Sequence, residues 1–152
     1  MIFSNIDGDL QWKRNFNRMT FPGVQYFKTD EHQCLCGKCV NQICHPALYL
    51  MLDDVRGSLD EPLVVNSGYR CKEHNASVGG RPLSKHLKGC AVDVATIPMR
   101  RGKGTKSEVF RLARIGEQRG FKGIGVYNTW VHLDIRSVRA VWGPMASEYL
   151  KL

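Results

Sequence analysis

Two histidines and one aspartate are the residues of this chain whose types and spacing best suit metal chemistry. His86 and Asp93 lie seven positions apart in the segment SKHLKGCAVDVA, on either side of Gly89. His132 lies in a second apolar segment, WVHLDIR. Two imidazoles and one carboxylate form a catalytic zinc set, because three protein ligands leave a fourth position open for water. The candidate cofactor is therefore one Zn²⁺ ion.

Both segments have the alternation of a β-strand, which explains how an acid can lie between two valines. Alternate side chains of a strand share a face, so Val92 and Val94 can fill the core while Asp93 lies on the opposite face. If the two strands are neighbours, His86, Asp93 and His132 converge. The residues alone leave a second interpretation open, because an isolated histidine near a strand is more often a hydrogen-bonded surface residue than a ligand.

The surrounding segments predict the elements that position these residues. Apolar residues at three- and four-residue spacing predict a helix that begins at Pro46 and ends at Gly57. Thr105 and Glu108 form a capping box before a second helix, which we expect to end at Gly120. The segments EPLVVNSGYR, AVDVA, GIGVY and WVHLDIR are typical of short strands. Helices that precede and separate such strands indicate an α+β fold.

Length and composition are those of one ordinary domain. The 152 residues, 43% of them hydrophobic, predict a single domain with an irregular, cysteine-rich part (1–45), a core (46–136) and a C-terminal extension (137–152). No apolar run is long enough to span a membrane, and the N-terminus lacks a signal-peptide pattern, so we expect synthesis in a cytoplasm. The net charge of +8 suits an anionic partner, but no nucleic-acid-binding motif accompanies it.

Four of the six cysteines are crowded into CLCGKCVNQIC, namely Cys34, Cys36, Cys39 and Cys44. In a chain without a signal peptide, a metal site or free thiols are favoured over a disulfide framework. A tetrathiolate zinc site usually has two well-separated cysteine pairs, so a second, structural zinc ion, disulfides and free thiols all stay open. We expect a local staple, by metal or disulfide, that orders the region before Pro46.

Three segments resemble a known family. Ser84-x-His86-x-x-Gly89-x-Ala91-x-Asp93 is similar to the signature of the zinc D,D- and L,D-peptidases of the M15 class. VNSGYRCKEHNASVGG, residues 65–80, resembles the segment that precedes this signature, and VHLDIR resembles the strand with the last zinc ligand. The resemblance runs from Phe27 to Arg136, and CLCGKC resembles a stretch of the compact phage-type branch. It implies the hedgehog-like fold of that class: a small antiparallel sheet with helices packed on one side and the zinc site on the open face.

The resemblance implies a role for each matching residue. His86, Asp93 and His132 would be the zinc ligands. Arg70, in SGYR, would bind the substrate carbonyl or carboxylate and stabilise the tetrahedral intermediate, since a guanidinium presents a fork of donors to negative charge. A structural salt bridge is the alternative for Arg70. Ser84 would contribute to substrate binding and orient the loop that carries His86.

The chain departs from the family at the general base. Many members have Asp or Glu three residues before the last zinc histidine, and often another histidine two before it, but here these positions are Thr129 and Trp130. Asp134 is the nearest carboxylate on the strand face of His132. It can act as the catalytic base or as an acceptor that orients the ligand imidazole. An ion pair with Arg136 would make it a poor base.

The implied function is zinc-dependent hydrolysis of an amide bond in peptidoglycan stem peptides, by a D,D- or L,D-carboxypeptidase or endopeptidase of the D-Ala or L-Ala/D-Glu type. A small, basic, signal-less domain of this kind resembles a phage endolysin, which we expect to be a monomer made in the host cytoplasm and acting at the cell wall or periplasm. One alternative is a non-catalytic zinc domain of a virion or tail that binds wall peptides, which Thr129 and Trp130 favour. A basic nucleic-acid-binding protein is the less favoured alternative.

Overall fold

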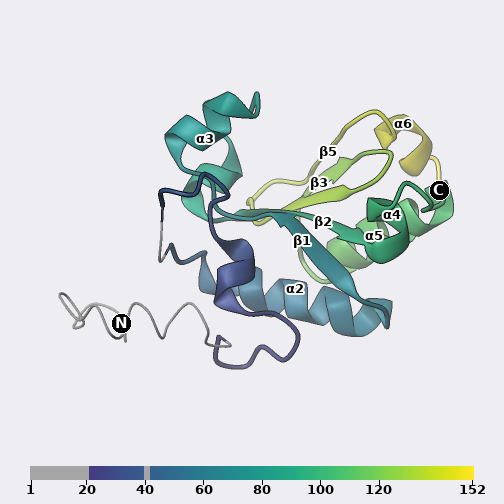
Figure 1. Cartoon of the computed structure of the whole chain (residues 1–152). Coiled ribbons are helices and arrows are strands. Elements are labelled where there is room, and N and C mark those ends of the chain that lie inside the picture. The colour runs from purple at the N-terminus through teal and green to yellow at the C-terminus, as the bar shows by residue number, and fades with distance from the viewer. Residues whose placement is uncertain (1–20, 40–41) are drawn as a thin grey trace.

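A computed structural model describes residues 21–39 and 42–152, in which a five-stranded sheet forms the centre (Figure 1). Its strands are β1 (Leu63–Ser67), β2 (Ala91–Thr96), β3 (Gly123–Val126), β4 (Val131–Asp134) and β5 (Ala140–Trp142). They lie in the order β1-β2-β4-β3-β5, and every pair is antiparallel except β3 and β5. The predicted α+β fold with a mostly antiparallel sheet is confirmed.

The strands β2 and β4 are direct neighbours. The sequence left this pairing open, and the convergence of His86, Asp93 and His132 depends on it. Asp93 lies opposite His132 in their register. On the other side of β4, Gly125 of β3 lies opposite His132, and Gly123 lies opposite Asp134. The polar positions of β2 and β4 therefore share one face of the sheet.

Two long helices and the opposite face of the sheet form the core. The two helices are α2 (Pro46–Leu59), which lies beneath the strands in Figure 1, and α5 (Lys106–Gln118). The residues with no exposed surface in this core are Leu48, Leu52, Val55, Val92, Val94, Ala95, Met99, Leu112, Ala113, Ile124, Val126, Val131 and Leu133. Burying one aliphatic side chain of the size of Val or Leu contributes about 1.5–3 kcal/mol, so this face anchors the strands that carry the polar face.

The ends of the two helices test the predicted boundaries. The side chain of His45 caps α2, but the helix continues past Gly57 and ends at Leu59, followed by the C-cap Asp60, whose φ of 57° is left-handed. The predicted end at Gly57 was wrong, because one glycine costs a helix only about 1 kcal/mol, whereas the buried Leu59 extends the apolar face. The capping box of Thr105 and Glu108 is present at the start of α5.

Short elements connect these layers. They are η1 (Thr29–His32), α3 (Lys72–Ser77), η2 (Lys85–Lys88), α4 (Ile97–Arg100) and α6 (Ala146–Tyr149). The predicted C-terminal extension supplies both β5 and α6, and Tyr149 is buried against the core, where its hydroxyl donates to Glu117. This segment is thus part of the folded unit. In the described part of the chain, no helix is long and apolar enough to cross a membrane.

Candidate metal centre

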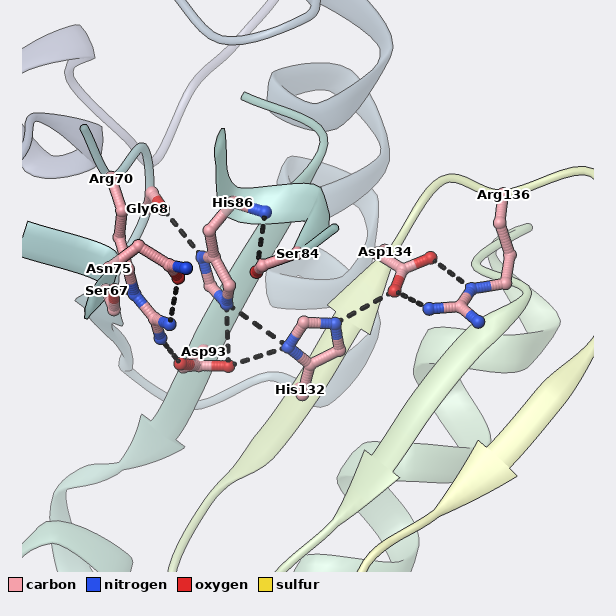
Figure 2. A network of polar contacts seen from close by, with 10 residues as sticks. All are labelled: Ser67, Gly68, Arg70, Asn75, Ser84, His86, Asp93, His132, Asp134 and Arg136. Atoms are coloured by element: carbon pink, nitrogen blue, oxygen red, sulfur yellow. Dashed lines mark hydrogen bonds and ion pairs between the residues drawn. The ribbon is translucent and has the colours of Figure 1, made fainter. Parts of the chain in front are cut away.

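His86 of η2, Asp93 of β2 and His132 of β4 point toward one another (Figure 2). The Nε2 atom of His86 lies 3.2 Å from Nδ1 of His132. The Oδ1 atom of Asp93 lies 2.9 Å from Nδ1 of His132 and 3.3 Å from Nε2 of His86. The structure therefore brings together the three residues that the sequence predicted as ligands.

The position of His86 depends on the turn η2 that precedes β2. Ser84 caps this turn by accepting a hydrogen bond from the backbone N–H of His86, and Gly89 ends it with a φ of 63°. The Nδ1 atom of the buried His86 ring lies 2.7 Å from the carbonyl oxygen of Gly68. Because a carbonyl only accepts, this contact places the ring proton on Nδ1 and leaves a lone pair on Nε2. That lone pair faces the other two ligand atoms.

The ring of His132 is held in the same way by Asp134. Its Nε2 atom lies 2.9 Å from Oδ2 of Asp134, which leaves Nδ1 as the acceptor that faces His86 and Asp93. Burial disfavours the charged imidazole, but hydrogen bonds to Asp134 and Asp93 outweigh it, so the pKa of His132 is raised. A carboxylate behind a ligand imidazole is a common partner in zinc sites, where it fixes the tautomer and the ring orientation.

The carboxylate of Asp134 is fully buried and fully engaged. Besides His132, it accepts hydrogen bonds from Nε and Nη2 of Arg136 at 2.7 and 2.6 Å. Burial alone would raise the pKa of Asp134, but the contacts with Arg136 and His132 outweigh it and lower this pKa to about 2. These contacts favour the orienting role of Asp134 over that of a proton acceptor.

The donor set fits a metal ion. The proton of His86 is then on Nδ1, and that of His132 is on Nε2. The lone pairs of the other two ring nitrogens and one oxygen of Asp93 face a common point with no hydrogen atom between them. Such an arrangement is repulsive unless a positive charge, that of a proton or of a metal ion, lies among the three atoms. Two imidazoles and one carboxylate are ligands that Zn²⁺ accepts, and a three-ligand set leaves a position open for water. The residues present therefore suit the zinc ion that the sequence predicts.

Two glycines of β3 make room for this arrangement. A Cβ at Gly125 would lie 2.8 Å from Cβ of His132, and one at Gly123 would overlap the carboxylate of Asp134. Glycine inside a strand often marks such a close approach. The segment GIGVY predicts only a strand from its apolar pattern, but its two glycines are also a signal for groups that lie close across it.

Arg70 follows β1 and reaches the metal centre from the side. Its Nη2 atom donates to Oδ2 of Asp93 at 2.7 Å, and its Nε atom donates to Ser67 at 2.9 Å. A third contact, from Nη1 to Asn75, is 3.4 Å long. Arg70 thus forms the ion pair that was the alternative to substrate binding, but its side chain also lines the cleft in front of the ligands.

An open cleft of about 790 Å³ lies in front of the three ligands. Its wall includes the aromatic residues Tyr127, Trp130 and Trp142 and the basic residues Arg70, Arg81, Lys85 and Arg136. Among the described residues that line it, the only carboxylates are those of Asp93 and Asp134. Ser84 also lines this cleft, whereas Thr129 does not. The cleft therefore suits an extended, anionic ligand.

Several residues of this wall were not predicted. Trp142 lies on β5, beyond the predicted core, and its ring centroid is 5.0 Å from that of His132. The guanidinium of Arg136 lies over the same Trp142 ring at 4.7 Å. Tyr127 stacks on Trp130 at 4.4 Å. The apolar triplet that forms β5 was the available signal, but it is too short to identify a strand from sequence.

Four cysteines form a second group of possible metal ligands, but one of its members differs from the four that the sequence predicts. Cys34, Cys36 and Cys39 lie together with Cys71, which precedes α3. Cys44 lies elsewhere, buried beside the hydroxyl of Tyr49, because it starts the chain segment that enters α2 and the core. Burial raises the pKa of the Cys44 thiol to about 11. All six cysteines of the chain are described, and none forms a disulfide.

A three-ligand metal set at the edge of an open cleft is the arrangement of a metallohydrolase. The sequence profile of the family described as peptidase M15 matches residues 25–134, which include His86, Asp93 and His132. The chain belongs to the peptidase M15 family, whose members are zinc-dependent. Comparison with curated proteins finds no match.

Proposed function

We propose that this protein is a zinc peptidase that hydrolyses an amide bond in peptidoglycan stem peptides. The observation that carries the proposal is the convergence of His86, Asp93 and His132, with ligand atoms within 4.8 Å of one another, in a chain of the M15 family. The resemblance to the phage-type branch and the net charge of +8 support action at the bacterial cell wall as an endolysin.

The protein's own residues prepare the site for hydrolysis. His86, Asp93 and His132 would hold a zinc ion, which would supply a water of lowered pKa and polarise a substrate carbonyl. The Gly68 carbonyl and Asp134 keep the two imidazoles in the tautomers that ligation requires. Arg70 holds Asp93 in place and lies at the cleft wall, where its guanidinium can meet the negative charge of the tetrahedral intermediate.

The charge of the cleft supports a stem peptide as the substrate. Four basic side chains line the cleft. Arg70 and Arg136 are paired with its two carboxylates, those of Asp93 and Asp134, whereas Arg81 and Lys85 form no ion pair among the described residues. Stem peptides carry free carboxylates on D-amino acids, which guanidinium groups can bind in pairs of hydrogen bonds. Ser84 supports the loop that carries His86 and also lines the cleft, where its hydroxyl can contact a substrate.

Asp134 acts as a positioning residue in this proposal. Its carboxylate lies behind the His132 ring, whereas the ligand atoms converge in front of that ring. Many family members have their general base at the position that Thr129 occupies here. The described cleft wall contains no carboxylate besides Asp93 and Asp134 that could replace it. This gap favours a second candidate function, a zinc-containing domain that binds wall peptides without cleaving them.

Digestion of purified peptidoglycan separates the two functions. The zinc-loaded protein should release muropeptides with a cut stem peptide, detected by mass spectrometry, and a chelator should stop the release until zinc is restored. His132→Ala should abolish it. His45→Asn is the matched control, because His45 caps α2 away from the cleft and asparagine is also a good N-cap. Zinc-dependent retention on peptidoglycan without any cleavage would establish the binding domain instead.

A further inference from the structure

A second cluster of metal-ligating side chains lies outside the cleft. The sulfur atoms of Cys34, Cys36, Cys39 and Cys71 all lie within 4.8 Å of one another. Three of these cysteines line a separate hollow of about 320 Å³, which shares no residue with the cleft. We propose that the four thiolates bind a structural Zn²⁺ ion, distinct from the ion of the metal centre.

The backbone around the cluster supplies donors to the sulfur atoms. Cys36 and Cys39 bracket a tight turn in which Gly37 has a φ of 75°. In this turn, the Sγ atom of Cys36 accepts the backbone N–H groups of Lys38 and Cys39 at 3.3 and 3.2 Å. Two N–H groups directed at one sulfur stabilise its thiolate, which is the form that binds metals.

The same pattern connects the turn to the segment after β1. The Sγ atom of Cys34 accepts the backbone N–H of Cys71 at 3.3 Å, and the Sγ atom of Cys71 accepts the N–H of His74 at 3.4 Å. Three of the four sulfurs thus receive backbone hydrogen bonds, as the thiolates of a metal site need from their surroundings. Neighbouring thiolates repel one another, so the four cysteines lose their protons together only when a cation lies among them.

The ligand chemistry selects a soft or borderline cation. Four thiolate sulfurs form a closed tetrahedral set, which is typical of structural zinc. A closed set has no open position for water, so this ion would stabilise the fold without taking part in hydrolysis. Three of the ligands come from one loop and the fourth from beyond β1, so the ion would join two parts of the chain.

The loop has little else to hold it. Cys34 is buried, but Leu35 is 67% exposed, and the other residues from 36 to 39 are exposed or half-buried. Apolar burial contributes little to such a segment, and metal binding is then a source of folding free energy. The fourth ligand, Cys71, directly follows Arg70, which holds Asp93. The proposed ion therefore anchors the segment that delivers Arg70 to the cleft.

Metal analysis of the folded protein tests this proposal. Protein purified under reducing conditions with zinc should contain two equivalents, measured by mass spectrometry of the elements. Cys39→Ser and Cys71→Ser should each lower the content to one. Cys90→Ser is the matched control, because Cys90 is a half-buried free thiol outside the cluster, and it should keep two. In the His132→Ala background one equivalent should remain, and the further change Cys39→Ser should remove it.

A measurement on the unaltered chain covers the case in which a variant does not fold. Zinc should protect the four cysteines from alkylation, and a chelator should expose them, as peptide mass spectrometry will show. Cobalt in place of zinc should give the strong near-ultraviolet bands of cobalt thiolates. Alkylation of these cysteines in zinc-loaded protein, or disulfides among them in the reduced preparation, would overturn the proposal. Neither result depends on whether the cleft hydrolyses a peptide.

Discussion

Replacing Asp134 by asparagine separates an orienting role from that of a general base. The carboxylate accepts one hydrogen bond from His132 and two from Arg136, so all three contacts are with N–H donors. An asparagine of the same shape has one acceptor oxygen, and its amide nitrogen must face a donor. One of the buried contacts is therefore lost, together with the negative charge that favours the orientation of the His132 ring.

The size of the effect follows from these contacts. Loss of such a carboxylate behind a ligand histidine weakens metal binding by about 10- to 100-fold, which is about 1.4–2.7 kcal/mol. We expect the zinc affinity of Asp134→Asn to fall by this factor, while hydrolysis recovers at saturating zinc. The loss of a hydrogen bond to the charged Arg136 should also lower the free energy of unfolding by about 1–3 kcal/mol.

The assay is a zinc titration against a competing chelator, combined with hydrolysis rates at low and saturating zinc. Glu117→Gln is the matched control, since Glu117 accepts from Arg139 and Tyr149 away from the cleft and undergoes the same change from acid to amide. A rate lower by about 100- to 10,000-fold with unchanged zinc affinity would identify Asp134 as the base. Normal affinity and a normal rate would refute both roles.

Three further predictions concern residues that support the metal centre or the stability of the fold. Gly125→Ala should weaken zinc binding, because its Cβ would lie 2.8 Å from Cβ of His132, and unchanged zinc affinity would contradict this reasoning. Burial lowers the pKa of His32 from 6.5 to about 4. The unfolded chain therefore takes up this proton first, so the free energy of unfolding should fall by about 3 kcal/mol as the pH drops through this range. In urea titrations His32→Phe should remove this fall, and an unchanged pH profile would exclude His32 as its source. Thr105→Ala should lower the free energy of unfolding by about 1 kcal/mol through loss of the cap on Glu108, and no change in urea unfolding would count against that cap.

Local patterns predicted the elements well where the signal was itself local. The capping box at Thr105 and the period-two alternation around Asp93 depend only on near neighbours in the chain, and both are present in the structure. The end of α2 was missed, because burial of Leu59 in the core outweighs the weak helix propensity of Gly57. The strand β5 was missed because three residues carry too little pattern to be recognised.

The sequence by itself determined the class of fold, the family and the set of residues that can bind a metal, because residue types, spacing and strand periodicity are properties of the chain. Only the tertiary structure decided which of these residues meet. The pairing of β2 with β4 places Asp93 opposite His132, and the fold brings Cys71, rather than Cys44, beside the other cysteines. The role of Asp134 likewise depends on burial and on the partners that the folded chain provides. Such contacts join residues far apart in sequence, so the cooperative packing of the sheet and helices decides them, and no local pattern records them.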